Sequence, residues 1–365
     1  MEKTLQRSKE DTLNAFYKKK TVVNFYLSAL VMLTHIHSFD SYEYTPPGGT
    51  CLQFLGVLLT SGMTGCAVRL FFIISGVLFY RNYTYGHTLE KYKSRAKSLL
   101  LPYLFWCCFY TILMLGLGLT PFRRMLALDM RINLKNILMG VFLNQYYKSF
   151  WFIFDLIIFT LICPVIYTLL RNKLVGAGVL AVSVVLYGMG IRIPETVQIA
   201  GQEYVLFWRA DSIIFYMLGA YIGLHFFNWF TSKKTPLVAV IGLIGYIGCS
   251  VYRAIGGHYN EMDAGIGYLV FMTIFCFSLW FLFDLFHYGK RLPELVSYSF
   301  MMFAMNFYLG VYISKILYLI LPKSQIWCLA NLALTVGMEL AVILSTSHFL
   351  SHKYNRFYRV IVGGR

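Results

Sequence analysis

Long apolar runs alternate with short polar or basic segments along the whole chain. A transmembrane helix needs about 20 consecutive, predominantly apolar residues to cross roughly 30 Å of hydrocarbon. We therefore predict about ten transmembrane helices, and an even number of crossings places both chain termini on the same side of the membrane. The predicted spans are residues 22–39, 64–81, 99–119, 150–170, 174–191, 211–230, 236–254, 266–286, 297–320 and 326–349.

The composition excludes a soluble globular protein. Of the 365 residues, 58% are hydrophobic, 18% are aromatic and only 13% are charged, which is typical of a chain surrounded by lipid. Internal repeats, low-complexity tracts and flexible linkers are missing from the sequence, and the outer loops are too short for a soluble catalytic domain. We predict an all-α, polytopic membrane bundle that forms one domain over residues 1–365. Residues 1–20 are the expected cytoplasmic lead-in, and residues 350–365 are the expected cytoplasmic tail.

The net charge of +16 comes from basic residues that lie between the apolar runs. Cytoplasmic loops of membrane proteins carry such an excess of Lys and Arg, facing anionic lipid, so no nucleic-acid partner is expected. With the N terminus inside, 21 of the 32 Lys and Arg residues fall in inner segments. The bias predicts a multi-pass membrane protein, in contact with membrane lipids, with both termini in the cytoplasm. The basic outer loop 120–149 either contacts an anionic glycan or is too long for the rule to apply.

Four stretches form an ordered motif. FFIISGVLFY at residues 71–80 is followed by KYKSRAKSLLLPYLFW at residues 91–106. The other two are a His-bearing first span around Thr34-His35 and WFIFDLIIFTLICPVIY at residues 151–167. Together they closely resemble the membrane-bound acyltransferase family 3, whose members O-acylate glycans at the bacterial surface.

The resemblance implies an O-acyltransferase of the cell inner (plasma) membrane. Its donor is acyl-CoA, with acetyl-CoA as the expected form, its acceptor is a hydroxyl of a cell-surface or lipid-linked glycan, and no metal ion is expected. The resemblance leaves open the glycan, the choice between direct transfer and an acyl intermediate, and the oligomeric state. The chain departs from the family pattern at Asn24, Phe154 and Asn306, where relatives often have Arg, Arg and His. An inactive relative, or a transporter that exports a polysaccharide or small anion, is therefore the alternative.

Two histidines near the outer end of the first predicted helix are candidates for a general base. His35 and His37 are two positions apart, which is about 200° of helix rotation, so they cannot both face the bundle interior. A neutral imidazole with a pKa near about 6.5 can take a proton from a sugar hydroxyl at neutral pH. The register of the family pattern selects His35 as the catalytic base. For either residue, a packing role at the membrane interface is the alternative.

Arg69 lies inside the second apolar run, where an ionised side chain is costly and therefore indicates function. In the predicted topology it lies one to two turns below the outer surface, at a depth similar to that of His35. We expect it to be catalytic by holding the acyl carbonyl or its developing oxyanion; snorkelling to lipid headgroups is the alternative. The nearby Ser75-Gly76 pair is expected to be a small-residue helix contact. At the sixth span, we expect Asp211 to pair with Arg209.

A basic segment connects the second and third predicted spans on the cytoplasmic side. Its four cations within seven positions are Lys91, Lys93, Arg95 and Lys97. Arg offers bidentate contacts to phosphate, and Lys acts as a point charge. We expect a short hairpin, residues 81–97, whose cations bind the phosphates of acyl-CoA. The alternative is that these charges only fix the topology.

Overall fold

The computed structural model of the protein describes residues 2–36, 51–120, 133–191, 196–199, 202–205, 209–256, 265–289, 291–322 and 325–364. The chain divides into two compact units. Unit 1 comprises residues 1–83, 167–192 and 211–348, and unit 2 comprises residues 84–166, 193–210 and 349–365.

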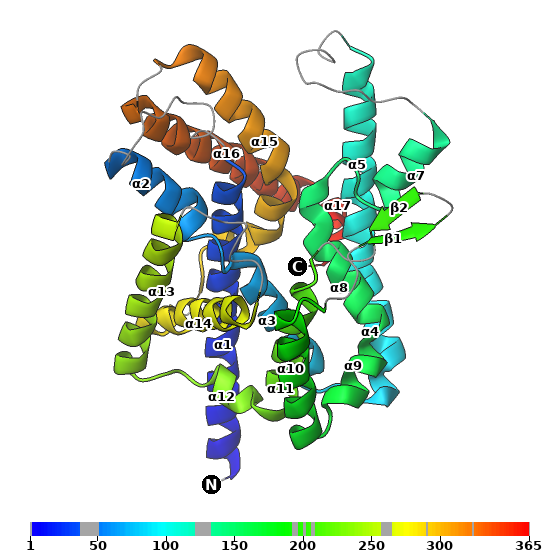
Figure 1. Ribbon diagram of the computed structural model, residues 1–365, viewed down its shortest axis with the longest axis vertical. Helices are drawn as coiled ribbons and strands as arrows, with labels where there is room; N and C mark the ends of the chain where they lie inside the picture. The colour runs from blue at the N-terminus through cyan, green and yellow to red at the C-terminus, as the bar shows by residue number, and fades with distance from the viewer. Residues whose placement is uncertain are drawn as a thin grey trace. The chain divides into compact units, whose positions relative to one another are not determined.

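Unit 1 is built from helices (Figure 1). They are α1 (Glu2–Thr34), α2 (Cys51–Val57), the π-helix η2 (Leu58–Gly62), α3 (Ala67–Tyr80), α10 (Lys173–Gly188), α11 (Ser212–His225), α12 (Phe227–Thr231), α13 (Pro236–Gly256), α14 (Ile266–Leu282), the 3-10 turns η6 (Phe283–Leu285) and η7 (Glu294–Tyr298), α15 (Ser299–Ile320) and most of α16 (Gln325–Lys353). Helix α1 buries Phe16, Val23, Leu27 and Leu30. This three-to-four-residue spacing gives the helix one apolar face toward the rest of unit 1.

Helices α3 and α11 approach each other closely because glycines line their contact. A Cβ on Gly76 would overlap the carbonyl oxygen of Tyr216, and a Cβ on Gly219 would overlap that of Ile73. Small residues allow such close backbone contact between membrane helices. Gly76 of the Ser75-Gly76 pair therefore forms the helix contact predicted from the sequence.

Unit 2 contains one strand pair as well as helices (Figure 1). Its elements are η3 (Tyr85–His87), α4 (Thr88–Arg95), the π-helix η4 (Ala96–Leu100), α5 (Leu101–Gly118), α7 (Leu134–Phe142), η5 (Lys148–Phe150), α8 (Trp151–Leu161), the first half of α9 (Cys163–Leu170), β1 (Thr196–Ile199), β2 (Gln202–Val205) and α17 (Asn355–Ile361). The two strands pair antiparallel, with Thr196 opposite Val205. The indole Nε1 of Trp106 donates to the carbonyl oxygen of Ile361 at 3.0 Å, which fixes α17 against α5.

Within the described residues, six helical segments are long and apolar enough to cross a membrane. They are Phe54–Tyr80, Tyr85–Gly118, Pro236–Ile255, Ile266–Leu285, Glu294–Ile320 and Ile326–Lys353. A seventh is added if the pair Lys148–Leu161 and Cys163–Leu170, bent by 68°, is one span. The predicted helical membrane architecture is confirmed, while the number of ten crossings stays a prediction.

Several boundaries differ from the sequence prediction, and two of the differences have a local cause in the sequence. The second span begins near Phe54, ten residues before the predicted start at residue 64, because the apolar run LQFLGVLL is itself helical. The fourth span, predicted as continuous, is interrupted between α8 and α9. Pro164 explains this interruption, since its ring clashes with the preceding turn and it cannot donate a helix hydrogen bond.

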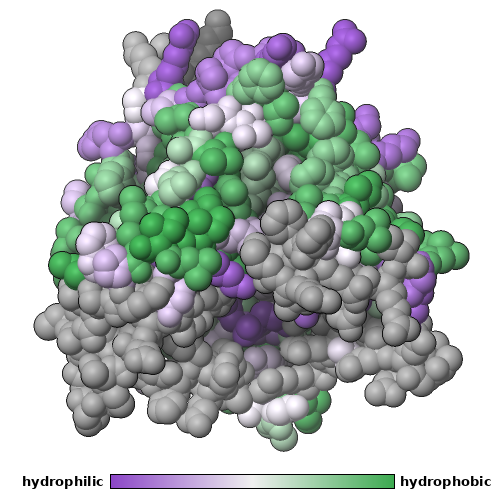
Figure 2. All heavy atoms as spheres, turned by 90° about the horizontal axis from the view of Figure 1, so that it is seen from above, coloured by the Kyte–Doolittle hydropathy of each residue, from purple (hydrophilic) through white to green (hydrophobic). Residues whose placement is uncertain are grey.

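Apolar side chains gather in patches on the outer surface, as the hydropathy colouring of one face shows (Figure 2). Helix α13 is the clearest case: Leu237, Ile241 and Ile244 are between 59% and 69% exposed. Their spacing places them on one side of the helix. An exposed apolar stripe of this kind faces lipid in a membrane protein.

Candidate functional site

The starts of three helices meet in unit 1 at a buried ion pair. Arg69 is the third residue of α3, Asp211 immediately precedes α11, and Tyr268 is the third residue of α14. The Arg69 side chain is 14% exposed and that of Asp211 is 3% exposed. We call these three residues the Arg69 cluster.

The hydrogen bonds of the Arg69 cluster form a closed triangle. Arg69 donates from Nε to Oδ2 of Asp211 at 3.2 Å and from Nη2 to the hydroxyl of Tyr268 at 2.5 Å. The Tyr268 hydroxyl in turn donates to Oδ2 of Asp211 at 2.9 Å. A further bond runs from Nη1 of Arg69 to the carbonyl oxygen of Gly65 at 3.2 Å. The guanidinium is therefore held in one orientation by three different segments.

Asp211 suits this position because of where it lies on its helix. It occupies the N-cap of α11, yet its side chain does not cap that helix. The positive end of the helix dipole still stabilises its carboxylate, which is free to reach Arg69. The pairing of Asp211 with Arg209 stays a prediction, and the sequence alone does not single out Tyr268. The bonds of Arg69 within unit 1 also disagree with the alternative of snorkelling to headgroups.

The predicted base, His35, lies just beyond the last residue of α1. Its ring meets that of Phe307 on α15 edge to face, with centroids 5.1 Å apart. This contact is with α15, whereas the described bonds of Arg69 are with α11 and α14. His37 lies outside the described residues, so the choice of His35 over His37, and a cavity shared by His35 and Arg69, stay predictions.

The basic segment after the second span is helical, not the predicted hairpin. Lys91, Lys93 and Arg95 lie on α4, and Lys97 lies on η4, within one helical run from Tyr85 to Gly118. The composition of this segment explains the difference, because Lys, Arg, Glu and Ala favour helix.

On such a helix, residues four apart share a side. Lys91 and Arg95 are half-buried, whereas Lys93 and Lys97 are exposed. The binding of acyl-CoA phosphates by these cations stays a prediction.

Polar side chains also line the contact between α15 and α16, and the sequence reasoning missed most of them. Asn331 donates from Nδ2 to the carbonyl oxygen of Ser314 at 3.1 Å, and its Oδ1 accepts from Thr335 at 3.0 Å. Farther along, Asn306 and Glu339 are fully buried. Among the described residues, neither side chain has a hydrogen-bond partner.

Glu339 lies in a notch of the neighbouring helix. A Cβ on Gly310 would stand 2.9 Å from its Oε2 atom, so the absence of a side chain there makes room for the carboxyl group. Gly310 is one helical turn from Asn306, so both polar groups face the same stretch of α15. The rule that identified Arg69 also applies to Glu339, a lone acid in an apolar run.

A second buried ion pair of unit 1 lies beyond the other end of α14. Nζ of Lys19 is 2.8 Å from Oδ1 of Asp284, and the two side chains are only 7% and 4% exposed. The same ammonium lies 4.1 Å from the ring centroid of Trp280. Burial lowers the pKa of Lys19 to about 8, and the nearby carboxylate only partly opposes this shift. Lys19 lies outside the predicted spans, in the lead-in that had been interpreted as simply cytoplasmic.

The comparison with known families agrees with the motif order. The sequence model of acyltransferase family 3, described as an acyltransferase domain, matches residues 27–347. The chain belongs to acyltransferase family 3. The matched region of this membrane acyltransferase includes the Arg69 cluster, His35, the cations of α4 and the polar residues between α15 and α16, but not Lys19. No curated protein and no solved structure matches the acyltransferase.

Proposed function

We propose that this acyltransferase moves an acyl group, acetyl in the expected form, from acyl-CoA to a hydroxyl of a cell-surface or lipid-linked glycan. Arg69 carries the proposal, because it is a guanidinium fixed by Asp211 and Tyr268 inside a membrane enzyme of an acyl-transferring family. Acyl transfer develops negative charge on the carbonyl oxygen. A preorganised cation in a water-poor site stabilises that charge most effectively.

The proposed reaction proceeds in two proton movements. His35 takes the proton of the glycan hydroxyl, and the oxygen attacks the thioester carbonyl carbon. Arg69 stabilises the oxyanion while the carbon–sulfur bond breaks. The leaving thiolate of coenzyme A then takes the proton from the imidazolium, which returns His35 to its neutral form. Asp211 and Tyr268 are positioning residues, since they contact Arg69.

We propose that the protein lies in the inner membrane of the cell and that the donor approaches it from the cytoplasm. In the predicted topology α3, α11 and α14 all run from outside to inside, so the Arg69 cluster lies near the outer surface where a glycan is available. The exposed cations Lys93 and Lys97, with Lys91 and Arg95, are proposed to bind the phosphates of the donor. The charge bias supports this orientation.

Purified protein in liposomes, given radiolabelled acetyl-CoA and extracted lipid-linked glycans, tests the reaction. His35→Ala is expected to lower the transfer rate by about 10²–10⁴-fold, whereas the matched control His37→Ala keeps most of it. Arg69→Lys is expected to be severe, because an ammonium cannot reproduce the planar contacts of a guanidinium. Loss of transfer in His37→Ala with retention in His35→Ala would exchange the two roles. Full transfer by both Arg69→Lys and His35→Ala would refute the mechanism.

A further inference from the structure

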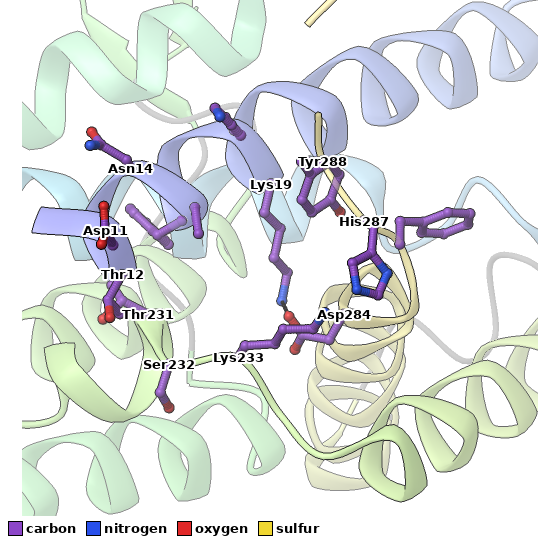
Figure 3. A pocket seen from close by; sticks show the side chains of 14 residues that line it. Asp11, Thr12, Asn14, Lys19, Thr231, Ser232, Lys233, Asp284, His287 and Tyr288 are labelled. Carbon is purple, nitrogen blue, oxygen red and sulfur yellow. Dashed lines mark ion pairs between the residues drawn. The ribbon is translucent and has the colours of Figure 1, made fainter. Parts of the chain in front are cut away.

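A cavity of about 620 Å³ lies beside the Lys19–Asp284 pair, which forms part of its lining (Figure 3). Three segments of unit 1 line it: the part of α1 from Asp11 to Lys19, residues 231–233 at the end of α12, and residues 284–288 after α14. Our topology places all three segments on the cytoplasmic side. We call this cavity the Lys19 pocket. It does not include the Arg69 cluster or α4.

The charges of the Lys19 pocket favour an anion. Lys19 is already paired with Asp284, and Lys18 donates to the carbonyl oxygen of Gly289 at 3.0 Å. Lys233 is exposed and has no hydrogen-bond or ion-pair partner among the described residues. In Figure 3 its side chain points toward the Lys19–Asp284 pair, while the acidic Asp11 lies at the far end of the pocket.

The lowered pKa of Lys19 indicates that the pocket holds too little negative charge to balance this ammonium. Burial lowers its pKa to about 8, Asp284 opposes the shift, and the neighbouring cations Lys233 and Lys234 add to it. The pairing with one carboxylate therefore does not compensate for the desolvation of the ammonium. An additional anion in the pocket would do so.

Asp284 adds a second requirement for the ligand. One of its oxygens pairs with Lys19, but Oδ2 is buried and has no hydrogen-bond partner in the described part of the chain. A buried acceptor without a donor is costly. A ligand with an N–H or O–H group beside its negative charge would satisfy this oxygen.

The size and walls of the pocket add a third requirement. Its volume lies within the range of about 300–1,000 Å³ that is typical of organic ligand sites, so it holds more than an inorganic anion. The rings of Phe16, Phe286, His287 and Tyr288 form part of its lining. Aromatic rings of this kind can stack on a nucleobase.

We propose that the Lys19 pocket binds a phosphate ester, with Lys233 contacting the phosphate and Oδ2 of Asp284 accepting a hydrogen bond from an amino or hydroxyl group of the ligand. A soluble nucleotide and the headgroup of an anionic phospholipid both offer this chemistry. The proposal goes beyond acyl transfer and does not depend on it, because it concerns binding at residues that take no part in the proposed reaction.

Calorimetric titration of the purified full-length protein in neutral detergent tests the soluble source. The probe is adenosine 3′,5′-bisphosphate, the nucleotide part of coenzyme A. Lys233→Gln is expected to raise its Kd about 10-fold, the effect of losing one charge-assisted contact. The matched control is Arg291→Gln, which removes one exposed charge from the same predicted inner face but does not line the pocket; it should leave Kd unchanged.

Lipid nanodiscs test the other source. The cations of α4 are also proposed to bind this nucleotide, so only the binding that Lys233→Gln weakens is assigned to the Lys19 pocket. If Lys233→Gln leaves the Kd of the probe unchanged, the melting temperature of the protein in phosphatidylglycerol should exceed that in phosphatidylcholine, and Lys233→Gln but not Arg291→Gln should reduce the difference. Either result, dependent on Lys233, supports a phosphate-ester site and identifies its source. The phosphate-ester site is overturned if neither binding of the probe nor stabilisation by phosphatidylglycerol is observed. It is also overturned if both are the same in the wild type and in the two variants. Because neither readout uses acyl transfer, failure here leaves the proposed function standing, and failure of transfer leaves this inference standing.

Discussion

The Arg69 cluster and the Lys19 pocket both hold a buried cation against an aspartate, yet the two sites are completed differently. In the Arg69 cluster, Oδ2 of Asp211 accepts from both Arg69 and Tyr268, and the tyrosine also accepts from the arginine. In the Lys19 pocket, Asp284 keeps one buried oxygen without a described partner, and the pKa of Lys19 is lowered to about 8. The closed network holds Arg69 in one orientation, whereas the incomplete network of the Lys19 pocket leaves an oxygen of Asp284 to bond a ligand.

The largest effect is expected where the closed network is cut. Asp211→Asn removes the negative charge that compensates Arg69, so we expect a loss of about 3–5 kcal/mol in the free energy of unfolding. Unfolding in mixed micelles of increasing dodecyl sulfate content measures this loss. Tyr268→Phe, which removes one hydroxyl but no charge, should cost only about 1–2 kcal/mol. Equal losses in the two variants would mean that the ion pair does not dominate the cluster.

The free energy of unfolding should depend on pH through the titration of Lys19. The unfolded chain keeps the Lys19 proton up to its ordinary pKa of 10.5, whereas the folded protein releases it near pH 8. Folding is therefore penalised by this group below pH 8, and stability rises with pH between about 8 and 10.5, by roughly 3 kcal/mol in total. Subtracting the same curve for Lys19→Met removes the contributions of groups that titrate elsewhere. If the difference in stability between the two proteins does not change over this pH range, the charge of Lys19 is fully compensated in the folded protein and this account is contradicted.

Helix α4 extends the comparison to exposed charges, which are screened by salt. Replacing Lys93, Arg95 and Lys97 together by Gln should raise the apparent KM for acyl-CoA about 10-fold, since each solvated contact contributes little. Added salt should reproduce part of the increase in the wild type. If the triple variant binds the donor as tightly as the wild type does, these cations only set the membrane topology.

The smallest effect is expected at Glu339, which offers the same chemical change as Asp211→Asn at a site without a described partner. Glu339→Gln removes no ion pair, keeps the side-chain shape and leaves no described partner unsatisfied, so the free energy of unfolding should change by less than about 1 kcal/mol. A loss as large as that of Asp211→Asn would show that a cation or ligand pairs with Glu339 in the membrane.

Hydropathy predicted where helices form, because lipid requires every backbone group to be bonded within its own segment. It could not locate the helical continuation through α4, because that segment is polar. The early start at Phe54 lies in an apolar run that the prediction left in a loop. Arg69 could be singled out from the sequence by the cost of burying its charge. Its partners could not, because Asp211 and Tyr268 lie 142 and 199 positions away along the chain.

The Lys19 pocket could not be predicted from the sequence either, because its residues are also far apart along the chain. A lysine-rich lead-in predicts an exposed cytoplasmic segment, and nothing local indicates that Lys19 is buried against Asp284, 265 positions later in the sequence. Glu339 differs from Lys19 in this respect, because its position within an apolar run was a usable signal.

Mass spectrometry of surface and lipid-linked glycans, from cells with and without this chain, tests acyl transfer most directly. Cells that lack the protein should lose one acyl mass, 42 Da for acetyl, while the glycan backbone remains at the surface; the value is the elementary mass of an added C₂H₂O group. Arg69→Lys should give the same spectrum as the deletion, provided the variant is present in the membrane. An unchanged acyl content in deleted cells, or the loss of the whole glycan from the surface, would contradict a glycan O-acyltransferase.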